Sequence, residues 1–379
     1  MEPQDGLHLP KPHNRRRILW IILGVVVLVV GGVALWAYSP KPPKEQPAEV
    51  IKKEDPPHPV SLKSRALFFG DVYWGRYIND WSQASPLKEA YPFSRLSEFG
   101  RENYDAWIAD LECPTVDGVH MSSAVEDDTL QFNCSPTYLA EAAKWFTVFS
   151  NANNHSDNQG GQAGLDETRR HLDEHGIQYF GHFDPRLLSD ICEVIALPVQ
   201  VTDSKAQQQK GQLPVAMCGF HGVFRRPGPE AIEVMQRYAN VMPVIAYPHM
   251  GAEYQPEPDQ IKQDTYRAMI DSGADMVLGD HPHWVQTSEA YKGKPIIYSM
   301  GNSIFDQQYN KEVTRSAGID ITFTVEGATP QQLAAWLELG KTCAAFRDSC
   351  LQAAEEQALQ RLPVAFHIKI AGTDNSGKI

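Results

Sequence analysis

Five short apolar segments of this chain end in the same way, each with a polar or ionisable side chain. They read FFGD, WIADLE, VFSNANNH, VIAYPH and MVLGDHPH, and stretches with the apolar spacing of amphipathic helices lie between them. Short strands that alternate with such helices are typical of an α/β fold with a substantial sheet. In that kind of sheet, ligands bind in the crevice beyond the carboxyl ends of the strands. The pattern therefore predicts an α/β domain whose strand ends line a pocket.

The side chains at these strand ends are carboxylates, amides and imidazoles, without a thiolate. They are Asp71, Asp110, Glu112, Asn153, Asn154, His155, His249, Asp280, His281 and His283. A mixed nitrogen and oxygen pocket suits Mn, Fe or Zn better than Ca or Mg. Because alternate residues of an extended segment point the same way, we expect His281 and His283 to share one metal environment. A single aspartate after a strand is usually a turn or capping residue, so the metal prediction rests on the joint pattern.

Residues 18–38 form an unbroken apolar run, ILWIILGVVVLVVGGVALWAY. At about 1.5 Å per residue the run matches the roughly 30 Å core of a bilayer, which predicts one transmembrane helix. The alternative is a signal peptide, but its apolar region is usually about 7–15 residues and ends at a small-x-small cleavage site. Lys11 and the arginines at 15–17 precede the run. They predict a single-pass protein of the cell membrane with a cytoplasmic N-terminus and an extracytoplasmic C-terminal domain.

The composition divides the chain into four predicted parts. A cytoplasmic tail, residues 1–17, and the transmembrane helix are followed by a proline-rich stalk at residues 39–64. We interpret residues 65–379 as one large domain. Within it, residues 329–379 have a helix-like stretch and then an alternating strand, which together are a candidate C-terminal appendage.

The formal net charge of −13 is concentrated in the predicted domain. Residues 1–64 hold nine Lys and Arg against six Asp and Glu, so the acidic excess lies after them. An acidic surface does not coat nucleic-acid phosphates, so nucleic acid is excluded as a partner. If the domain acts on phosphates, it needs a metal ion or a local group of positive charges.

Six cysteines would face an oxidising compartment in this topology, which permits disulfides. Cys343 and Cys350 are seven residues apart. In an unbroken helix their Cα atoms would be about 10 Å apart, beyond the roughly 7 Å limit for a bridge, so we do not expect this pair. Cys192 and Cys218 either pair across adjacent strands or remain small buried side chains.

The motifs also resemble those of a known family. The matching segments are GDVYWGR (70–76), ADLECP (109–114), NANNHSDNQGGQAGLDETRRHL (151–172), PHMGAEY (248–254), GADMVLGDHPHWVQ (273–286) and IIYSMGNSIFDQ (296–307). In order and spacing they are similar to the CapA family of capsule and poly-γ-glutamate synthesis proteins, within the calcineurin-like metallophosphoesterase superfamily. The resemblance implies an α/β fold that is a four-layer αββα sandwich, with the site at one edge of the paired sheets.

The resemblance also implies a site with two divalent metal ions, Mn, Zn or Fe. The implied ligands are Asp71 as the first metal-binding aspartate, Glu112 as the bridging carboxylate, Asn154 and His249 at the second metal, and His281 and His283, one for each metal. His155 matches the histidine that protonates a leaving oxygen or stabilises phosphate. Two ions roughly 3.5–4 Å apart would clamp a phosphate and align the attacking water, with Asp71 and His155 as the catalytic residues.

Some positions depart from the family pattern or carry alternatives. Tyr73 stands where superfamily enzymes usually have a metal-binding histidine, and Asp110 stands where the family usually has asparagine, which makes Asp110 a possible second bridging carboxylate. Arg76 either contacts substrate or pairs with an aspartate. Glu253 flanks the site by resemblance, and Asn302 is either a site residue or part of a hairpin turn.

Two functions follow, from different classes. The first is a membrane-anchored metal-dependent hydrolase that acts on a phosphoester substrate or an anionic surface polymer during capsule synthesis. The second is a non-hydrolytic scaffold or polymer-binding component of a polymer export complex. Either function makes membrane subunits of capsule synthesis candidate partners.

Overall fold

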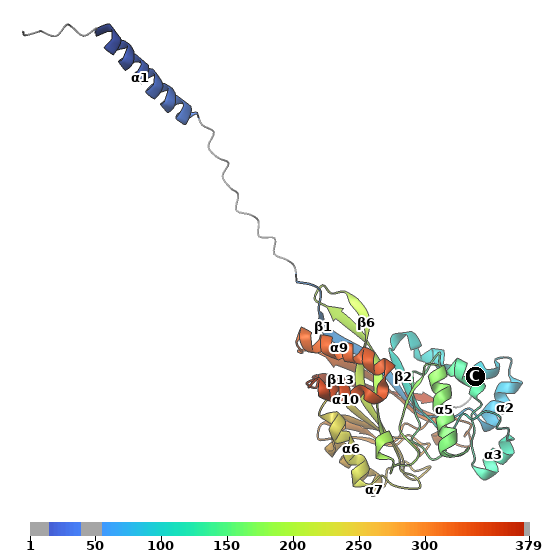
Figure 1. Ribbon diagram of the computed structural model, residues 1–379. Coiled ribbons are helices and arrows are strands. Elements are labelled where there is room, and N and C mark those ends of the chain that lie inside the picture. The colour runs from blue at the N-terminus through green and yellow to red at the C-terminus, as the bar shows by residue number, and fades with distance from the viewer. Residues whose placement is uncertain (1–14, 39–54, 375–379) are drawn as a thin grey trace, which may run out of the picture. The chain divides into compact units, whose positions relative to one another are not determined.

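The computed structural model describes residues 15–38 and 55–374 (Figure 1). Residues 1–14, 39–54 and 375–379, which include most of the predicted tail and stalk, lie outside the described residues. The chain divides into two compact units, Met1–Pro56 and Pro57–Ile379. We call the second unit the body.

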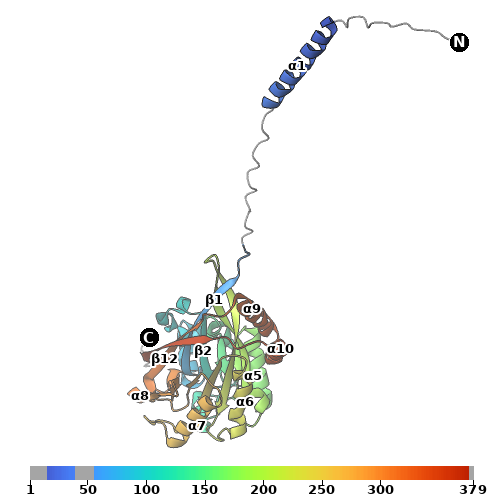
Figure 2. The same ribbon diagram turned by 90° about the vertical axis from the view of Figure 1, so that its left-hand side faces the viewer.

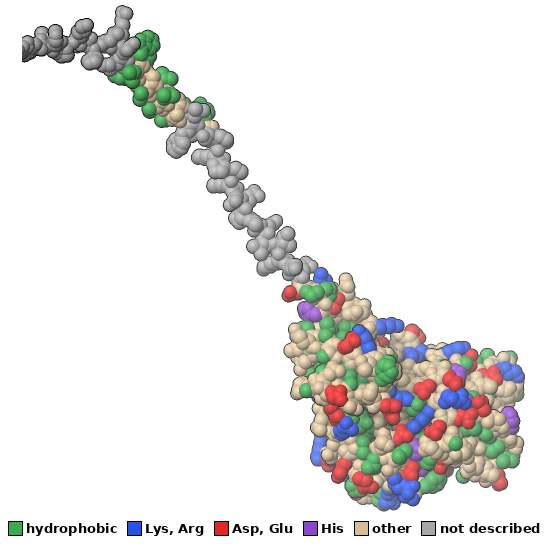
Figure 3. All heavy atoms as spheres, in the orientation of Figure 1, with side chains coloured by type: hydrophobic (Ala, Val, Ile, Leu, Met, Phe, Trp, Pro, Cys, Tyr) green, Lys and Arg blue, Asp and Glu red, His purple; other side chains and the backbone are tan. Residues whose placement is uncertain are grey.

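The apolar run of the first unit forms helix α1 (Arg15–Ala37). Its large apolar side chains from Trp20 to Val33 are all more than half exposed, and Figure 3 shows hydrophobic side chains along this part of the helix. In the part of the chain that the structure describes, none of the helices combines the length and the apolar character that crossing a membrane requires. The predicted anchor at residues 18–38 therefore stays a prediction.

Thirteen strands within residues 55–374 join in one hydrogen-bonded network. They are β1 (Pro59–Val72), β2 (Ala106–Leu111), β3 (Val148–Ser150), β4 (Gln178–Phe180), β5 (Cys192–Asp203), β6 (Gln208–His221), β7 (Val244–His249), β8 (Met276–Leu278), β9 (Ser288–Tyr291), β10 (Lys294–Ile297), β11 (Asn302–Ile304), β12 (Arg315–Val325) and β13 (Val364–Asp374). The main order is β4-β3-β2-β1-β5-β6-β7-β8-β10-β9, with β11 and β12 beside β1 and β13 beside β12.

Helices cover this mixed sheet. Those of the body are α2 (Arg76–Ala84), α3 (Ser123–Thr129), α4 (Leu139–Ala142), α5 (Gln162–Glu174), α6 (Pro229–Ala239), α7 (Gln260–Asp271), α8 (Lys311–Thr314), α9 (Pro330–Ala345) and α10 (Cys350–Glu356). Figure 2 shows α5, α6, α9 and α10 along one side of the strands. The mixed α/β class is thereby confirmed, and the finer four-layer sandwich stays a prediction.

Strand β1 pairs with four other strands, and its side chains contribute to the apolar clusters on both faces of the sheet. It pairs in parallel with β2 and β11 and in antiparallel with β5 and β12. Ala66 and Phe68 belong to the larger apolar cluster, while Leu67 and Phe69 belong to a second cluster. Because successive side chains of a strand point to opposite faces, this alternation places apolar core on both sides of β1.

The body begins before the predicted boundary at Arg65. Residues 59–64, which the sequence analysis assigns to the stalk, form the first part of β1, where Leu62 pairs with Val201 of β5 and Val325 of β12. Leu62 is also fully buried in the larger cluster. Pairing on both sides and burial make this segment part of the folded body, so the predicted boundary at Arg65 lies too late in the chain.

Residues 329–379 are not an appendage over the part that the structure describes. Strand β13 pairs with β12 along its whole length, and α9 packs on β1, β5 and β6 through Leu333, Trp336 and Leu339. A Cβ at Gly340 would overlap the carbonyl oxygen of Gln212, so glycine permits the close approach of helix and strand. Thr329 starts α9 with a capping box, followed by Pro330 at the first helical position.

Three disulfides join all six cysteines: Cys113–Cys134, Cys192–Cys218 and Cys343–Cys350. The expectation that Cys343 and Cys350 do not pair is wrong. Helix α9 ends at Ala345, and a short turn before α10 brings the two Cα atoms to 4.9 Å. Of the two alternatives for Cys192 and Cys218, pairing is the one observed, because they face each other in the β5–β6 register.

Candidate metal centre

The polar strand ends meet at one edge of the sheet, as the sequence pattern predicts. In the parallel pair β1–β2, Asp71 lies opposite Asp110, and Asp71 also lies opposite Asn302 of β11. His249 at the end of β7 forms a bridge to Asp280, just beyond β8. Because parallel strands end on the same side, these pairings bring side chains from distant parts of the chain to one place.

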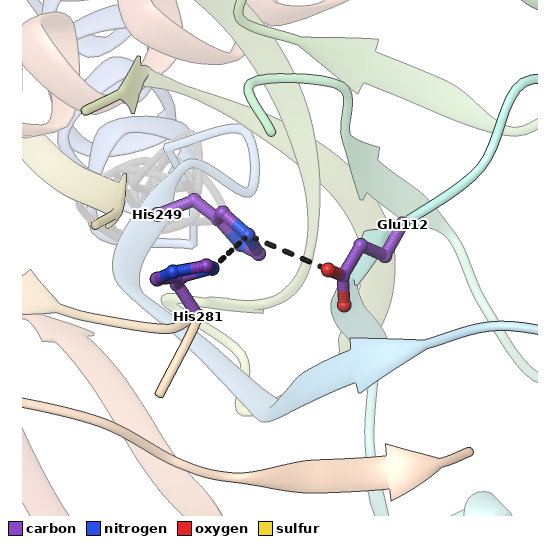
Figure 4. Close-up of side chains that lie close together, drawn as sticks. All are labelled: Glu112, His249 and His281. Carbon is purple, nitrogen blue, oxygen red and sulfur yellow. Dashed lines mark hydrogen bonds and ion pairs between the residues drawn. The ribbon is translucent and has the colours of Figure 1, made fainter. Parts of the chain in front are cut away.

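His249 is the centre of this arrangement (Figure 4). Its Nδ1 lies 3.5 Å from Oδ1 of Asp71 and 3.3 Å from Oδ2 of Asp110. Its Nε2 lies 3.7 Å from Oε1 of Glu112, 2.8 Å from Oδ1 of Asn154 and 3.2 Å from Nδ1 of His281. Acceptor atoms therefore crowd around one imidazole.

His283 completes the group from the other side. Its Nδ1 is 3.3 Å from Oδ2 of Asp71, and its Nε2 is 4.0 Å from Oε1 of Glu112. Asp71 and Glu112 thus lie between His249 and His283. The structure brings all six predicted ligands together: Asp71, Glu112, Asn154, His249, His281 and His283.

Three overlapping trios of these residues have ligand atoms within 4.8 Å of one another: Glu112, His249 and His281; Asp71, Asp110 and His249; Asp71, Glu112 and His283. Shared carboxylates between neighbouring trios are what a site for more than one ion requires. The buried His, Asp and Glu groups have the composition to hold a metal ion. Its identity and the number of ions stay predictions.

The hydrogen-bond census supports a cation at this place. Among the described residues, both carboxylate oxygens of Asp71, Glu112 and Asp280 are buried without a hydrogen-bond partner, as are Oδ1 of Asp110 and Nδ1 of His249. Burying a carboxylate without a partner costs several kcal/mol or more. A bound cation would remove that cost, so these residues fit a metal.

The pKa shifts have the same cause. Burial, together with the charges of Asp71 and Asp110, raises the pKa of Glu112 well above its ordinary value, and burial raises that of Asp110 to about 7. Burial lowers the pKa of His249 to about 3, so its ring is neutral, which is the form that binds metal. Glu112 and Asp110 therefore resist ionisation beside the neutral ring of His249. At His283 the effect of burial is outweighed by the neighbouring Asp71, which raises the pKa of the ring.

His155 faces the same group from the turn after β3. Its Nε2 is 3.8 Å from Oε1 of Glu112, and its ring stacks on Phe132 at 3.9 Å between centroids. Nδ1 is 2.8 Å from Oδ1 of Asn158 and donates to it, which leaves the lone pair on Nε2. Burial lowers the pKa of His155 to about 3. The ring is therefore fixed, with one nitrogen toward the site.

Two asparagines hold the loops that carry the candidate metal ligands. Asn153 donates from Nδ2 to Oδ2 of Asp110 (3.1 Å), while its Oδ1 accepts from the backbone N–H of His155 (3.0 Å). Asn302 accepts at Oδ1 from Nδ1 of His283 (2.8 Å), so it is a site residue and not part of a simple turn. The sequence analysis placed Asn153 at a strand end but gave it no role.

The His281–His283 segment is not extended, contrary to expectation. Both residues have positive φ angles, 91° and 56°, and the segment bends after β8. Backbone strain of this kind persists where the surroundings fix it, and it is common at functional sites. The bend turns the two rings toward different trios. His281 belongs to the trio with Glu112 and His249, and His283 belongs to the trio with Glu112 and Asp71.

Tyr73 and Arg76 have structural partners. The Tyr73 hydroxyl donates to Oε2 of Glu126 (2.6 Å) in the buried interior, and Arg76 binds Asp306 with two hydrogen bonds of 2.8 and 2.6 Å. For Arg76, pairing with an aspartate is thus the alternative that the structure supports. Glu253 lies at the rim of a cavity of about 560 Å³ that Asn154, His155 and His283 also line.

Lys262 is a buried cation that no sequence pattern indicates. This residue lies on α7 and is fully buried, with Nζ donating to Oε1 of Gln286 at 3.0 Å. Burial lowers its pKa to about 7, against the opposing influence of Asp280 and Asp71. A lysine in an amphipathic helix is typical of a solvent-exposed face, so the sequence carried no signal of this position.

The family described as bacterial capsule synthesis protein PGA_cap matches residues 65–189 and 200–307. The PGA biosynthesis protein CapA of Bacillus subtilis (strain 168) is 28% identical over 264 residues, 65% of this chain and 64% of that protein. The capsule biosynthesis protein CapA of Bacillus anthracis is 24% identical over 274 residues, 67% of this chain and 62% of that protein. The chain thus spans slightly less than two thirds of each relative.

A solved structure, TT1561 of Thermus thermophilus, is 9% identical with a TM-score of 0.37, covering 67% of this chain and 93% of that chain. At that TM-score, no conclusion about this chain rests on it.

Proposed function

Because this chain belongs to the bacterial capsule synthesis protein PGA_cap family, we propose that it is a metal-dependent phosphoester hydrolase of capsule or surface-polymer synthesis. One observation carries the proposal. Asp71 and Glu112 are buried, and none of their carboxylate oxygens has a hydrogen-bond partner. The two side chains lie between the imidazole rings of His249 and His283. Divalent ions bound there, two in our proposal, would supply Lewis-acid stabilisation of the charge on a phosphoryl group.

The chain's own residues would supply the proton transfer. Nε2 of His155 faces Glu112, and Asn158 and Phe132 hold the ring in that orientation. A phosphoester beside Nε2 brings negative charge, which favours the protonated ring and opposes the effect of burial. His155 would then hold the proton at Nε2 and donate it to the leaving oxygen. Asn302 and Asn153 act as positioning residues for His283 and Asp110.

The test uses the full chain purified in neutral detergent. Metal content is measured by mass spectrometry, and hydrolysis of p-nitrophenyl phosphate and bis-p-nitrophenyl phosphate is measured with Mn²⁺ or Zn²⁺. We expect Asp71→Asn and His281→Ala to lose metal and at least about 100-fold in kcat/KM. The exposed residues Asp166 and His120, changed in the same way, are the matched controls. Absence of bound metal together with unchanged activity in the site variants would overturn the proposal.

We also propose that residues 18–38 anchor the protein in the cell membrane, with the body outside. The apolar run and the basic residues before it support this placement. The three disulfides support it as well, because such bonds persist in oxidising compartments outside the cytosol. Carbonate extraction of membranes should retain the full chain and release a chain without residues 18–38. Equal release of both would contradict the anchor.

A non-hydrolytic role remains the second candidate, and one observation favours it. Tyr73, at the position of a superfamily metal ligand, is buried against Glu126 and Phe132. The protein would then bind polymer or a membrane subunit of the synthesis complex as a scaffold. A strain whose Asp71→Asn and His281→Ala proteins support normal surface polymer, while deletion of the gene does not, would select this function.

A further inference from the structure

Two arginines of the body differ from all the others in its described residues. Every other arginine in residues 55–374 contacts a carboxylate or carbonyl oxygen: Arg65, Arg76, Arg95, Arg101, Arg169, Arg170, Arg186, Arg237, Arg267, Arg315, Arg347 and Arg361. Arg225 and Arg226 are exposed and have no hydrogen bond or ion pair within the described residues. In a body with an acidic excess, two adjacent unpaired cations stand out as available for an external anion.

Both arginines lie on the loop of residues 222–228, between β6 and α6, which we call the arginine loop. The loop is attached to the metal centre, because the backbone N–H of Gly222 donates to the carbonyl of His249 at 2.9 Å. Its Phe224 lines the 560 Å³ cavity beside His155 and is 79% exposed. The arginine loop therefore forms part of the mouth of that cavity.

The residues that line the cavity offer no unpaired lysine or arginine to an anionic ligand. Of its lining residues Arg76 alone is a lysine or arginine, and Asp306 and Asp127 already bind it. Asp157 and Glu253 add negative charge to the lining. Asp184 lies within range of the charge of Arg225 but already binds Arg186 through both carboxylate oxygens. A polyanion entering the cavity would thus meet its positive partners at the mouth.

We propose that the arginine loop binds an anionic polymer and holds it across the mouth of the metal-centre cavity. Arg225 and Arg226 contact its charged groups, since a guanidinium pairs bidentately with carboxylate or phosphate. Phe224 packs against the apolar part of its backbone. The inference deepens the proposed function by naming an anionic polymer as the ligand at the mouth of the same cavity. It rests on that function for its catalytic meaning, but polymer binding is measured without hydrolysis.

The experiment measures binding of two fluorescent polymers, poly-γ-glutamate and inorganic polyphosphate, to the full chain in neutral detergent. The variant is Arg225→Gln with Arg226→Gln. The matched control, Arg170→Gln with Arg315→Gln, removes the same charge from two arginines that already have partners. At low salt we expect the loop variant to lose about tenfold in affinity and the control less than twofold. The polymer that binds the wild type more tightly identifies the charged group.

Each outcome separates the two proposals. Equal losses in the two double variants, or no polymer binding by the wild type, would overturn the inference. A further outcome is that the wild type does not hydrolyse p-nitrophenyl phosphate while the loop variant, and not the control, loses polymer affinity. In that case the hydrolase proposal fails and the polymer site stands. Phe224→Ala should weaken polymer binding severalfold, whereas Phe346→Ala, which removes an exposed phenylalanine elsewhere, should not.

Discussion

Arg76 is a buried cation at the edge of the candidate metal centre, and its partner explains its place. Asp306 is 230 residues away in sequence and equally buried, and the two side chains share two hydrogen bonds. The sequence left two alternatives for Arg76 because a pairing over that separation depends on the fold. The strand-end ligands, in contrast, were predictable, because each lies directly after its own apolar segment.

Removing this cation should be costly. We expect Arg76→Met to lower the free energy of unfolding by about 3–5 kcal/mol, because it leaves Asp306 buried and unpaired. Adding Asp306→Asn should recover much of the loss, since the unpaired charge is then absent. Chemical denaturation of the three proteins measures this. A double variant no more stable than Arg76→Met would show that the pair does not act as a unit.

Glu193 provides a pH test away from the metal centre. Burial raises its pKa to about 7, against the opposing influence of Arg347, so the folded protein holds a proton that the unfolded chain releases near pH 4.3. Its contribution to stability is therefore full at low pH and is lost as the pH rises to about 7. The free energy of unfolding of the Glu193→Gln protein, relative to that of the wild type, should rise by about 1–3 kcal/mol between pH 5 and pH 8. A difference in the free energy of unfolding between variant and wild type that stays constant over this pH range would contradict the raised pKa of Glu193.

At the scale of elements, the ends of helices and strands limited what the sequence could predict. The Cys343–Cys350 distance depends on where α9 stops, and Phe346 leaves the helix with a φ of −140°. The bend after β8 likewise depends on tertiary contacts, which hold His281 and His283 at positive φ. Local periodicity predicts that a helix or strand exists but determines its boundaries poorly.

The disulfides allow a prediction from loop length. Cys192 and Cys218 are 26 residues apart and Cys343 and Cys350 are 7 apart, while all four are buried. In the chain-entropy account the longer loop contributes about 3.5 kcal/mol and the shorter about 2.5 kcal/mol. Replacing each pair by alanines should therefore destabilise the β5–β6 variant more, by about 1 kcal/mol in chemical denaturation. The reverse order would show that packing outweighs chain entropy here.

At the scale of the whole molecule, metal should stabilise the fold. A ligand that binds only the folded state raises the free energy of unfolding as its concentration increases. A cation would bind favourably here because it would compensate the buried carboxylates that lack hydrogen-bond partners. We expect Mn²⁺ to raise the melting temperature of the chelator-treated full chain by several degrees. Glu112→Gln should abolish that rise and be at least as stable as the wild type without metal, because it replaces a buried carboxyl group whose ionisation is opposed by burial. A Glu112→Gln protein that responds to Mn²⁺ like the wild type would contradict this.

The family and the fold class were within reach of the sequence, and the comparisons confirm the resemblance to the CapA family. The motif series supplied the family, and the alternation of strands and helices supplied the α/β class. The role of β1 was not predictable, because its four partners come from across the chain. For the same reason the sequence does not reveal that β13 pairs with β12, and residues 329–379 are only a candidate appendage in it. Long-range pairing leaves no local pattern in an alternating strand.

The three neighbours β1, β12 and β13 also determine how the body would respond to a pulling force. Leu62 of β1 is level with Val325 of β12 and Val364 of β13, whereas β13 runs on past the level of Phe68 toward Asp374. The chain thus enters and leaves this trio at opposite ends. A force between the two ends of the body would load the ladder hydrogen bonds lengthwise and together, and not one after another as in unzipping. Mechanical resistance at single-molecule extension should therefore be high.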